Sequence, residues 1–347
     1  FIYQSDPALA ARQWLWAVLG LIVFTLIILF WRDYRFLPDY KYIFMFIGLV
    51  FLVLTILVGT EAGGARSWLS LGSFRFQPAE PVKLLLIIFL AAYLAENAPF
   101  LVEGDERRPA FWFDLGRYGP VLLLLGMTLL LLAVQKDLGA ALIFFGVFLA
   151  MLYVAYGRLA HLLFGGVIFA MASLAAYYLF PHIRGRVAIW INPWPLADST
   201  GYQIIQSIFL LAQGGLFGLG IGLSKPSYIP AAATDFVFSI ACGELGFLGG
   251  AFILTIYMLI GYRSITFCQE APDEFGLLLG AGLSLLFSIQ SLVIVGGILR
   301  LLPLTGVTLP FMSYGGSSLV INYIMFGLLL SLSSQFRRAR GESTDEV

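Results

Sequence analysis

The chain has 347 residues, of which 60% are hydrophobic and 12% are charged, and its formal net charge at pH 7 is zero. A mean hydropathy of +0.92 places it far from the average soluble protein. The balanced charge excludes the basic surface that nucleic-acid binding requires. The two cysteines, Cys242 and Cys268, offer neither a disulfide framework nor a metal-ligand spacing.

Apolar segments recur along the whole chain and predict an all-α, polytopic helical membrane protein. Most of these segments are long enough to cross a bilayer as helices, and they lack the polar face of a soluble helix. We expect nine spans, at residues 14–31, 42–58, 82–95, 119–135, 138–156, 159–180, 236–262, 276–299 and 313–335. No internal repeat or linker interrupts them, so the chain is predicted to form a single domain over residues 1–347.

Residues 201–223 form an ambiguous tenth element, too polar and too rich in glycine for a plain span. Gln203, Gln206 and Gln213 fall near one face of a helix drawn through this segment. We therefore expect an amphipathic or re-entrant helix on the outer surface, inside a large outer loop at 181–235. The Gly218–Gly222 run lacks a preceding strand, so it does not predict nucleotide binding.

The distribution of Lys and Arg among the short loops predicts the orientation. Arg337, Arg338 and Arg340 place the C-terminal tail in the cytoplasm, and counting back places Asp235, Asp137 and the start of the third span outside. Residue 1 then also lies outside, without a visible signal peptide. This awkward start suggests that a first helix precedes the sequence, which would bring the total to about ten.

Residues 225–238 form a polar, proline-bracketed loop that ends in a lone carboxylate, Asp235, directly before an apolar run. A charged residue at the end of a membrane helix is costly to dehydrate, which indicates a function. The alternative is that Asp235 only caps the helix that follows it.

Two further sets of charged residues are predicted to face the same side. Glu80 and Lys83 are three residues apart and can form an ion pair on a helix, either as an interfacial salt bridge or as part of a polar cavity in which Lys83 binds phosphate. Asp137 lies between two spans, as a turn residue or as an oxygen ligand for a divalent cation.

The outer loop and the last span add a possible anion site. Arg184 and Arg186 suit either membrane-surface anchoring or an anionic headgroup. Residues 303–318 contain prolines, glycines and serines at membrane depth, where broken helices are tolerated only if they are buried or line a cavity. The helix that begins there is either entered through a tight turn or offers free N–H groups to an anion.

Taken together, these motifs resemble the SEDS family of cell-wall polymerases, and within it the members that act in cell elongation. The matching motifs cover most of the chain in family order: Gly64-Ala65-Arg66-Ser67-Trp68, Phe76-Gln77-Pro78-Ala79-Glu80 with Lys83, Asp137-Leu138-Gly139, Asn192-Pro193-Trp194, Gly201-Tyr202-Gln203 with Ser207, Pro230 to Asp235-Phe236, Gly243-Glu244-Leu245-Gly246, and Thr305-Gly306 to Ser317.

The resemblance implies ten transmembrane helices in the bacterial cytoplasmic membrane and a peptidoglycan glycosyltransferase whose active site faces outward. Such an enzyme polymerises lipid II into glycan strands and releases undecaprenyl diphosphate. The implied partner is a class B penicillin-binding protein, a transpeptidase. A lipid II flippase and a non-catalytic scaffold of the wall-synthesis complex are the alternatives.

The resemblance also implies the roles of individual residues, with Asp235 as the catalytic carboxylate. The expected substrate and diphosphate ligands are Arg66, Glu80, Lys83, Asp137, Arg186, Gln203, Ser313, Gly315, Gly316 and Ser317. A divalent cation, Mg or Mn, held by Asp137 or Asp235 is conceivable, and no organic cofactor is expected. Ala231 and Ala233 replace the Glu and His that the family often has, so neither side chain can be required here, which argues against a mechanism with a histidine base near Asp235.

Overall fold

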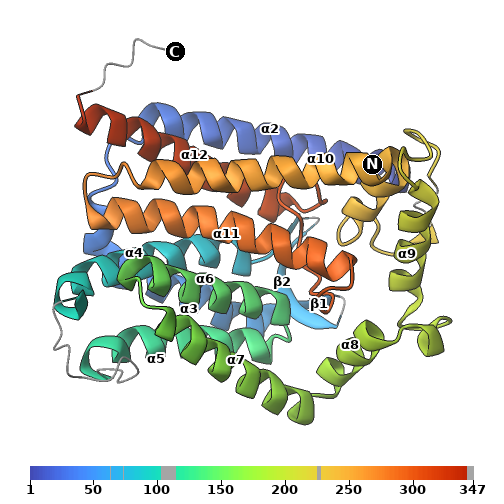
Figure 1. The fold of residues 1–347 in the computed structure, drawn as a ribbon, viewed down its shortest axis with the longest axis horizontal. Helices are drawn as coiled ribbons and strands as arrows, with labels where there is room; N and C mark the ends of the chain where they lie inside the picture. Colours follow the sequence, from blue (N-terminus) through green and yellow to red (C-terminus); the bar gives the residue numbers. More distant parts are fainter. Residues whose placement is uncertain (63, 73, 103–114, 225–227, 342–347) are drawn as a thin grey trace. The chain divides into compact units, whose positions relative to one another are not determined.

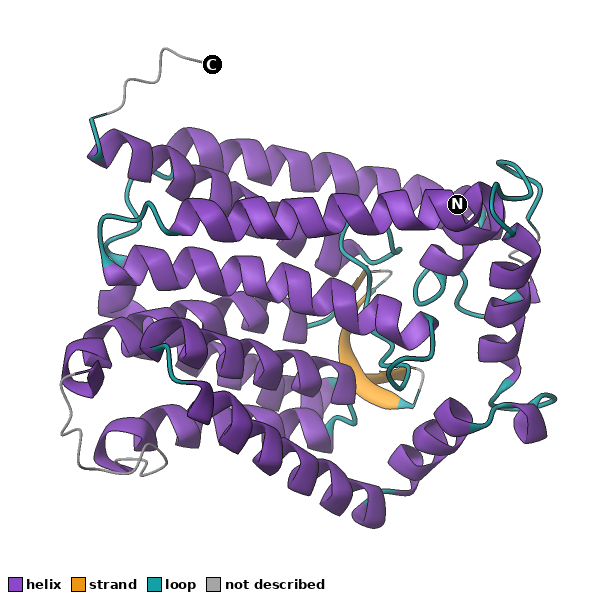
Figure 2. Ribbon diagram, viewed as in Figure 1, coloured by secondary structure: helices purple, strands orange, loops and turns teal. Residues whose placement is uncertain are grey.

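The structure is a computed structural model that describes residues 1–62, 64–72, 74–102, 115–224 and 228–341. Helices make up most of the chain, and the strands are confined to one small sheet (Figure 2). The helices are α1 (Ile2–Ser5), α2 (Pro7–Phe30), α3 (Lys41–Val58), α4 (Ala79–Val102), α5 (Leu115–Val134), α6 (Leu138–Tyr156), α7 (Leu159–Leu179), α8 (Pro181–Ile191), α9 (Tyr202–Gly214), α10 (Val237–Cys268), α11 (Glu274–Ile298) and α12 (Gly316–Ala339), with short 3-10 turns at Leu37–Tyr40 and Trp194–Leu196.

Each predicted span corresponds to one of these helices, which confirms the all-α, multi-pass membrane architecture. Seven of the described helices are long and apolar enough to cross a membrane, and a shorter apolar helix covers Gly119–Val134 within α5. The segment predicted as an extra element forms α9, a 13-residue helix that ends at Gly214. The Arg107–Arg108 pair and Lys225 lie outside the described residues.

The chain divides into two compact units, each built from separate stretches of sequence. The first comprises Phe1–Val18, Ile168–Ile260 and Gln290–Leu319, and the second comprises Leu19–Val167, Gly261–Ile289 and Val320–Val347. The predicted site residues are distributed over both units, so each unit is described by itself.

In the second unit, α3 packs against α4 and α5, and α6 packs against the same two helices (Figure 1). The start of α4 is specified locally: Pro81 lies in its first turn, where the missing N–H is tolerated, and Glu80 is favourable near the positive end of the helix dipole. Asp137 caps α6, and Gly157 ends it in a left-handed conformation with φ 64°.

A three-stranded antiparallel sheet connects α3 to α4. Its strands are β1 (Thr60–Ala62), β2 (Ala65–Leu71) and β3 (Phe74–Phe76), in the order β1-β2-β3. The backbone N–H of Arg66 in β2 donates to Gln135 O at 3.0 Å, which ties the sheet to the end of α5. The sheet thereby fixes the approach of the chain to the start of α4.

In the first unit, α10 is interrupted at Gly246, whose φ of 71° and ψ of −172° are not helical. The chain that follows α9 runs beside this interruption and satisfies its backbone. Leu219 N donates to Gly243 O and Gly220 N to Glu244 O, both at 3.0 Å, while Phe247 N donates to Gly215 O at 2.8 Å. The buried polar groups of the broken helix are thus paired with another segment, as a membrane environment requires.

Candidate functional site

Asp235 ends a loop whose backbone is held by a segment far away in the sequence. Asp235 N donates to Ala231 O at 3.0 Å, and Ala231 adopts a positive φ of 56°, which is uncommon for a residue with a Cβ. From the turn before α12, Tyr314 N donates to Ala233 O at 2.8 Å, and the Ser313 hydroxyl donates to Thr234 O. The carboxylate is therefore placed by a constrained loop.

The Asp235 side chain is partly buried and lies close to a second loop. A Cβ built on Gly306, which has a φ of 71°, would lie 3.8 Å from Asp235 Oδ2. Burial raises the pKa of the Asp235 carboxyl, and the Thr234 hydroxyl and the Arg186 charge lower that pKa to a smaller extent. No backbone N–H among the described residues donates to this carboxylate, so the helix-capping alternative finds no support.

Arg186, from α8, reaches the same loop. Its Nη1 donates to Thr305 O at 3.3 Å and lies 3.5 Å from Leu304 O. One nitrogen of the guanidinium therefore holds the loop that carries Gly306. The positive charge of Arg186 beside Asp235 could bind an anionic group of a substrate.

The residues predicted to form an anion site at the start of α12 are largely engaged within the fold. The buried Ser313 hydroxyl donates to Thr234 O and accepts from Leu309 N at 2.9 Å, so its proton is not available to an anion. Gly315 N donates to the amide oxygen of Gln13 at 3.4 Å. A Cβ on Gly316 would lie 2.3 Å from the Trp16 ring. Ser313 thus supports the Asp235 loop, Gly316 permits close contact with Trp16 of α2, and the backbone N–H of Gly315 is already bonded to Gln13.

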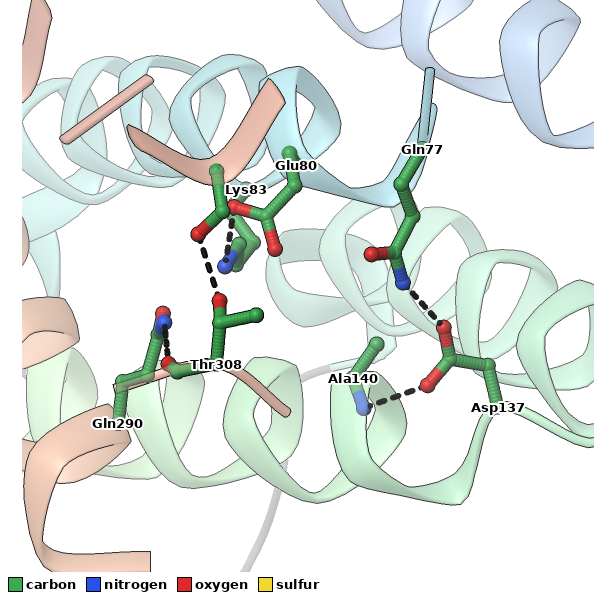
Figure 3. A network of polar contacts seen from close by, with 8 residues as sticks. Gln77, Glu80, Lys83, Asp137, Ala140, Gln290 and Thr308 are labelled. Atoms are coloured by element: carbon green, nitrogen blue, oxygen red, sulfur yellow. Dashed lines mark hydrogen bonds and ion pairs between the residues drawn. The ribbon is translucent and has the colours of Figure 1, made fainter. Parts of the chain in front are cut away.

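A polar network connects this turn to α11. Gln290 in α11 donates through Nε2 to Thr308 O at 2.8 Å, as Figure 3 shows, and the Thr308 hydroxyl lies 2.7 Å from that of Ser318. Ser317 is buried in the same turn of α12. Gln203 lies in the first turn of α9 in the same unit and is partly exposed.

In the second unit, the predicted Glu80–Lys83 ion pair is present, with 2.8 Å between Glu80 Oε2 and Lys83 Nζ. Both side chains are only 4% exposed. A carboxylate and an ammonium that are buried to this extent each depend on the other, because an unpaired charge there would be strongly destabilising. The pair is shown beside the Gln77–Asp137 contact in Figure 3.

Asp137 accepts two hydrogen bonds in this unit. Ala140 N donates to Oδ1 at 3.0 Å, and Gln77 Nε2 donates to Oδ2 at 3.1 Å (Figure 3). Burial raises the pKa of the Asp137 carboxyl, the hydrogen bonds from Ala140 and Gln77 lower it, and the nearby Glu80 charge raises it. Asp137 is therefore a helix cap that lies within the electrostatic influence of the ion pair, and its role as a cation ligand stays a prediction.

Arg66 is exposed on β2, and its Nε donates to Gly59 O at 2.9 Å. The structure thus sorts the predicted site residues into two sets. The set in the first unit contains Asp235, Arg186, Gln203, Ser313, Gly315, Gly316 and Ser317, and the set in the second contains Arg66, Glu80, Lys83 and Asp137.

Sequence reasoning missed the contribution of Gln13 and of Gln290, which bind backbone groups around the start of α12. A glutamine inside an apolar helix was the available signal, since buried amides need partners. Among the described residues, no group of three or more His, Cys, Asp or Glu side chains is placed to hold a metal ion.

Comparison with known proteins adds independent information. Residues 2–338 match the profile of the FtsW, RodA and SpoVE family, described as cell cycle protein. The peptidoglycan glycosyltransferase RodA of Mycobacterium tuberculosis strain H37Rv is 40% identical over 333 residues, which cover 95% of this chain and 71% of the relative.

Two solved structures extend the similarity to the fold. One, described as the structural coordination of polymerization and crosslinking by a peptidoglycan synthase complex, matches with a TM-score of 0.77 and 31% identity over 98% of this chain and 92% of the other. RodA of Thermus thermophilus matches with a TM-score of 0.68 and 29% identity, over 96% of this chain and 90% of the other.

Proposed function

The chain belongs to the FtsW, RodA and SpoVE family of cell cycle proteins, as its motifs predict, and from this premise we propose how it acts as a peptidoglycan glycosyltransferase. The substrate is lipid II, the product is a glycan strand made during cell elongation, and the leaving group is undecaprenyl diphosphate. The observation that carries the mechanism is the partly buried Asp235 carboxylate beside Arg186, in a loop fixed by Ser313 and Tyr314.

Asp235 acts as the general base. Its carboxylate removes the proton from the 4-hydroxyl of the acceptor sugar while that oxygen attacks the anomeric carbon of the lipid-linked strand. The new C–O bond forms as the bond from the anomeric carbon to the diphosphate oxygen breaks, and the diphosphate leaves with the electron pair. A single displacement of this kind inverts the configuration at the anomeric carbon.

The departing diphosphate gains negative charge, so cationic groups and N–H donors must stabilise it. We assign this task to Arg186, Lys83 and Arg66, with the first N–H groups of α12, at Gly316 and Ser317, as the backbone contribution. Arg186 supports the assignment because only one of its nitrogens is engaged with the loop at 304–305. Glu80, Asp137 and Gln203 are assigned to orienting these groups and the sugar.

A divalent cation, Mg or Mn, remains a prediction, with Asp137 or Asp235 as its protein ligand. The described residues do not form a cage, and both Asp137 oxygens already accept hydrogen bonds. A magnesium ion bound here would therefore take most of its ligands from diphosphate and water, as it commonly does in proteins. No step of the mechanism depends on it.

The active site is proposed to face outward from the bacterial cytoplasmic membrane, where the strand is assembled. The partner is proposed to be a class B penicillin-binding protein, because one matching structure belongs to a complex that coordinates polymerization with crosslinking. Coupling the two activities in one complex would deliver each new strand to a transpeptidase.

The test uses purified protein with lipid II and measures glycan chains directly. Asp235→Asn keeps the shape of the side chain and removes the base, so chains are expected to disappear while the protein stays folded. The matched control is Asp198→Asn, which neutralises an exposed carboxylate in the same loop region and is expected to leave the rate unchanged. Unaltered synthesis by Asp235→Asn would rule out this mechanism.

The interruption of α10 at Gly246 favours one alternative, a lipid II flippase, because transporters often bind substrates at discontinuous helices. The same assay separates the two, since a flippase makes no glycan from lipid II that is already accessible. A scaffold of the wall-synthesis complex likewise makes none, and Asp235→Asn would then leave growth of the cell unaffected.

A further inference from the structure

The helix α8 carries Arg186, yet little of α8 is held by apolar packing. None of its 11 residues is fully buried, and Ile189 is only partly buried where it packs against the hydrophobic core cluster, whereas α9 buries five of its residues, among them Ile204, Ile205 and Leu210. A helix with so little buried surface gains little from the hydrophobic effect. Directed contacts must therefore contribute much of its placement.

Those contacts join the end of α8 to the turn after α11. Trp190 Nε1 donates to Arg300 O at 3.0 Å, and Arg300 Nη2 donates to Trp190 O at 2.9 Å and to Ile191 O at 3.1 Å. The two residues thus bind each other in both directions. A guanidinium is also favourable at this position because the last carbonyls of a helix are unpaired and carry partial negative charge.

Arg300 makes these contacts from an unusual conformation. Its φ is 59°, a region that residues with a Cβ rarely adopt, and its Nε is buried with no hydrogen-bond partner among the described residues. Such strain persists where the surrounding structure imposes it, and it is concentrated at functional sites. Here the conformation directs the guanidinium to the end of α8.

Arg186 and Trp190 are four residues apart, so they lie on the same face of α8. Fixing Trp190 at Arg300 therefore also fixes the direction in which Arg186 leaves the helix. From there Arg186 holds the carbonyls of Leu304 and Thr305, next to Gly306 and Asp235. Arg300 and Arg186 thus form two attachment points for one helix on the segment at 300–306.

We propose that Arg300 is a positioning residue, which acts through Trp190 and α8 to hold Arg186 where it binds the diphosphate of the lipid substrate. This rests on the proposed function for the role of Arg186. Arg300 itself has its guanidinium directed at α8 carbonyls, so its effect on the ligand is indirect. Removing it leaves Arg186 present in the chain but no longer held beside Asp235.

The test measures binding of undecaprenyl diphosphate to the purified full chain, which requires no catalysis. Arg186→Ala and Arg300→Ala are each expected to raise the Kd about tenfold. The double variant is expected to bind no more weakly than Arg186→Ala alone, because residues that act through one contact are not additive. Arg263→Ala, which removes an exposed charge near the C-terminal end of α10, is the control and is expected to bind like the parent.

Two conservative variants separate positioning from charge. Arg300→Lys keeps the positive charge, but its ammonium ends one bond short of the position of Nη2, the nitrogen that binds both carbonyls, so it is expected to behave like Arg300→Ala. Trp190→Phe keeps an aromatic ring, although a smaller one, and removes the N–H that bonds to Arg300 O, and a loss of affinity of about threefold is expected. Thermal unfolding of every variant is measured, and variants that melt like the parent are compared.

Parent-like affinity of folded Arg300→Ala, full recovery by Arg300→Lys, or additive losses in the double variant would each overturn the proposal. Unchanged affinity of Arg186→Ala would overturn it as well, since Arg300 would have no ligand contact to position. A failure of the polymerase mechanism would be detected in a different experiment, because Asp235→Asn would then still synthesise glycan. The binding measurements require no catalysis, so they could still be interpreted in that case.

Discussion

At the scale of single residues, Asp235 combines two opposing influences. Burial raises its pKa, which keeps the group basic enough to accept a proton, while the Arg186 charge favours the ionised form. The loop contacts from Ser313 and Tyr314 hold it in place without using its oxygens. These are the properties required of a general base, and they can be tested through the pH dependence of the activity.

A general base must be ionised, so activity should be lost as the pH falls through the raised pKa of Asp235. This acid limb is expected at a higher pH than for an ordinary aspartate. Arg186→Gln removes a charge that lowers this pKa, so the pKa rises further and the limb of kcat/KM should move to higher pH. The measurement is the pH dependence of glycan synthesis by both proteins.

Arg184→Gln is the control for this experiment, because it removes a charge from α8 that does not affect the pKa of Asp235. Its acid limb should coincide with that of the parent even if its rate differs. A limb that stays in place in Arg186→Gln, or that moves to lower pH, would show that another group controls the profile.

Asp137 leads to a second prediction at this scale, because its cap function and its possible role as a cation ligand respond differently to mutation. Asp137→Ala removes the acceptor for Ala140 N and is expected to lower the free energy of unfolding by about 1–2 kcal/mol. Asp137→Asn retains that acceptor, and its amide can pair with a turned Gln77 side chain. Its stability should therefore be close to that of the parent.

Activity of Asp137→Asn then decides whether the carboxylate has a further role. If residue 137 acts only as a helix cap, Asp137→Asn should preserve the rate of glycan synthesis at every Mg²⁺ concentration. A stable Asp137→Asn protein that requires more Mg²⁺ than the parent would instead assign a cation to this position.

At the scale of elements, the interruption of α10 explains why the segment after α9 is rich in glycine. Gly218 has a φ of 84°, and a Cβ there would lie 2.0 Å from Glu244 O and 2.6 Å from Gly246 N. The atoms in the way are backbone, so no side-chain rotation can relieve the contact. Gly218 thus serves close backbone packing, which agrees with the expectation that the Gly218–Gly222 run does not form a nucleotide site.

Gly218→Ala is therefore expected to destabilise the protein by at least about 2 kcal/mol, from left-handed strain together with displaced backbone hydrogen bonds. Thermal unfolding in detergent measures the effect. Gly166→Ala in α7 is the control, since a Cβ there meets nothing within 4 Å, and a helical alanine should be neutral or stabilising. Equal melting temperatures for both variants would contradict this account of α10.

The helices could be predicted from the sequence because hydrophobic runs of membrane length have few other structures. The small sheet was missed because residues 65–71 do not alternate in polarity, and Gly72 before the return strand was the one hairpin signal. Short strands beside long apolar runs are easily assigned to loops. The break at Gly246 was missed because glycines within a long, mostly apolar run are compatible with a continuous helix, and residues 243–250 contain four of them.

At the scale of the whole molecule, family and activity were predictable from spaced motifs, but contacts between distant residues were not. Glu80 and Lys83 are three residues apart, so their pairing follows from helix geometry. The contacts of Arg186 with Thr305 and of Trp190 with Arg300 span more than a hundred residues. They depend on how α8 folds back onto the chain, which local periodicity does not encode.

The proposed orientation in the membrane rests on the positive-inside rule and can be tested on the whole chain. Thr200→Cys introduces a thiol at an exposed position in the loop predicted to lie outside, and Ala339→Cys introduces one at an exposed position near the end predicted to be cytoplasmic. Background labelling should be low because Cys242 and Cys268 are buried. With a membrane-impermeant thiol reagent on intact cells, Thr200→Cys should be labelled and Ala339→Cys should react only after permeabilisation. The opposite pattern would place Asp235 in the cytoplasm, where a strand-forming reaction would build glycan on the wrong side of the membrane.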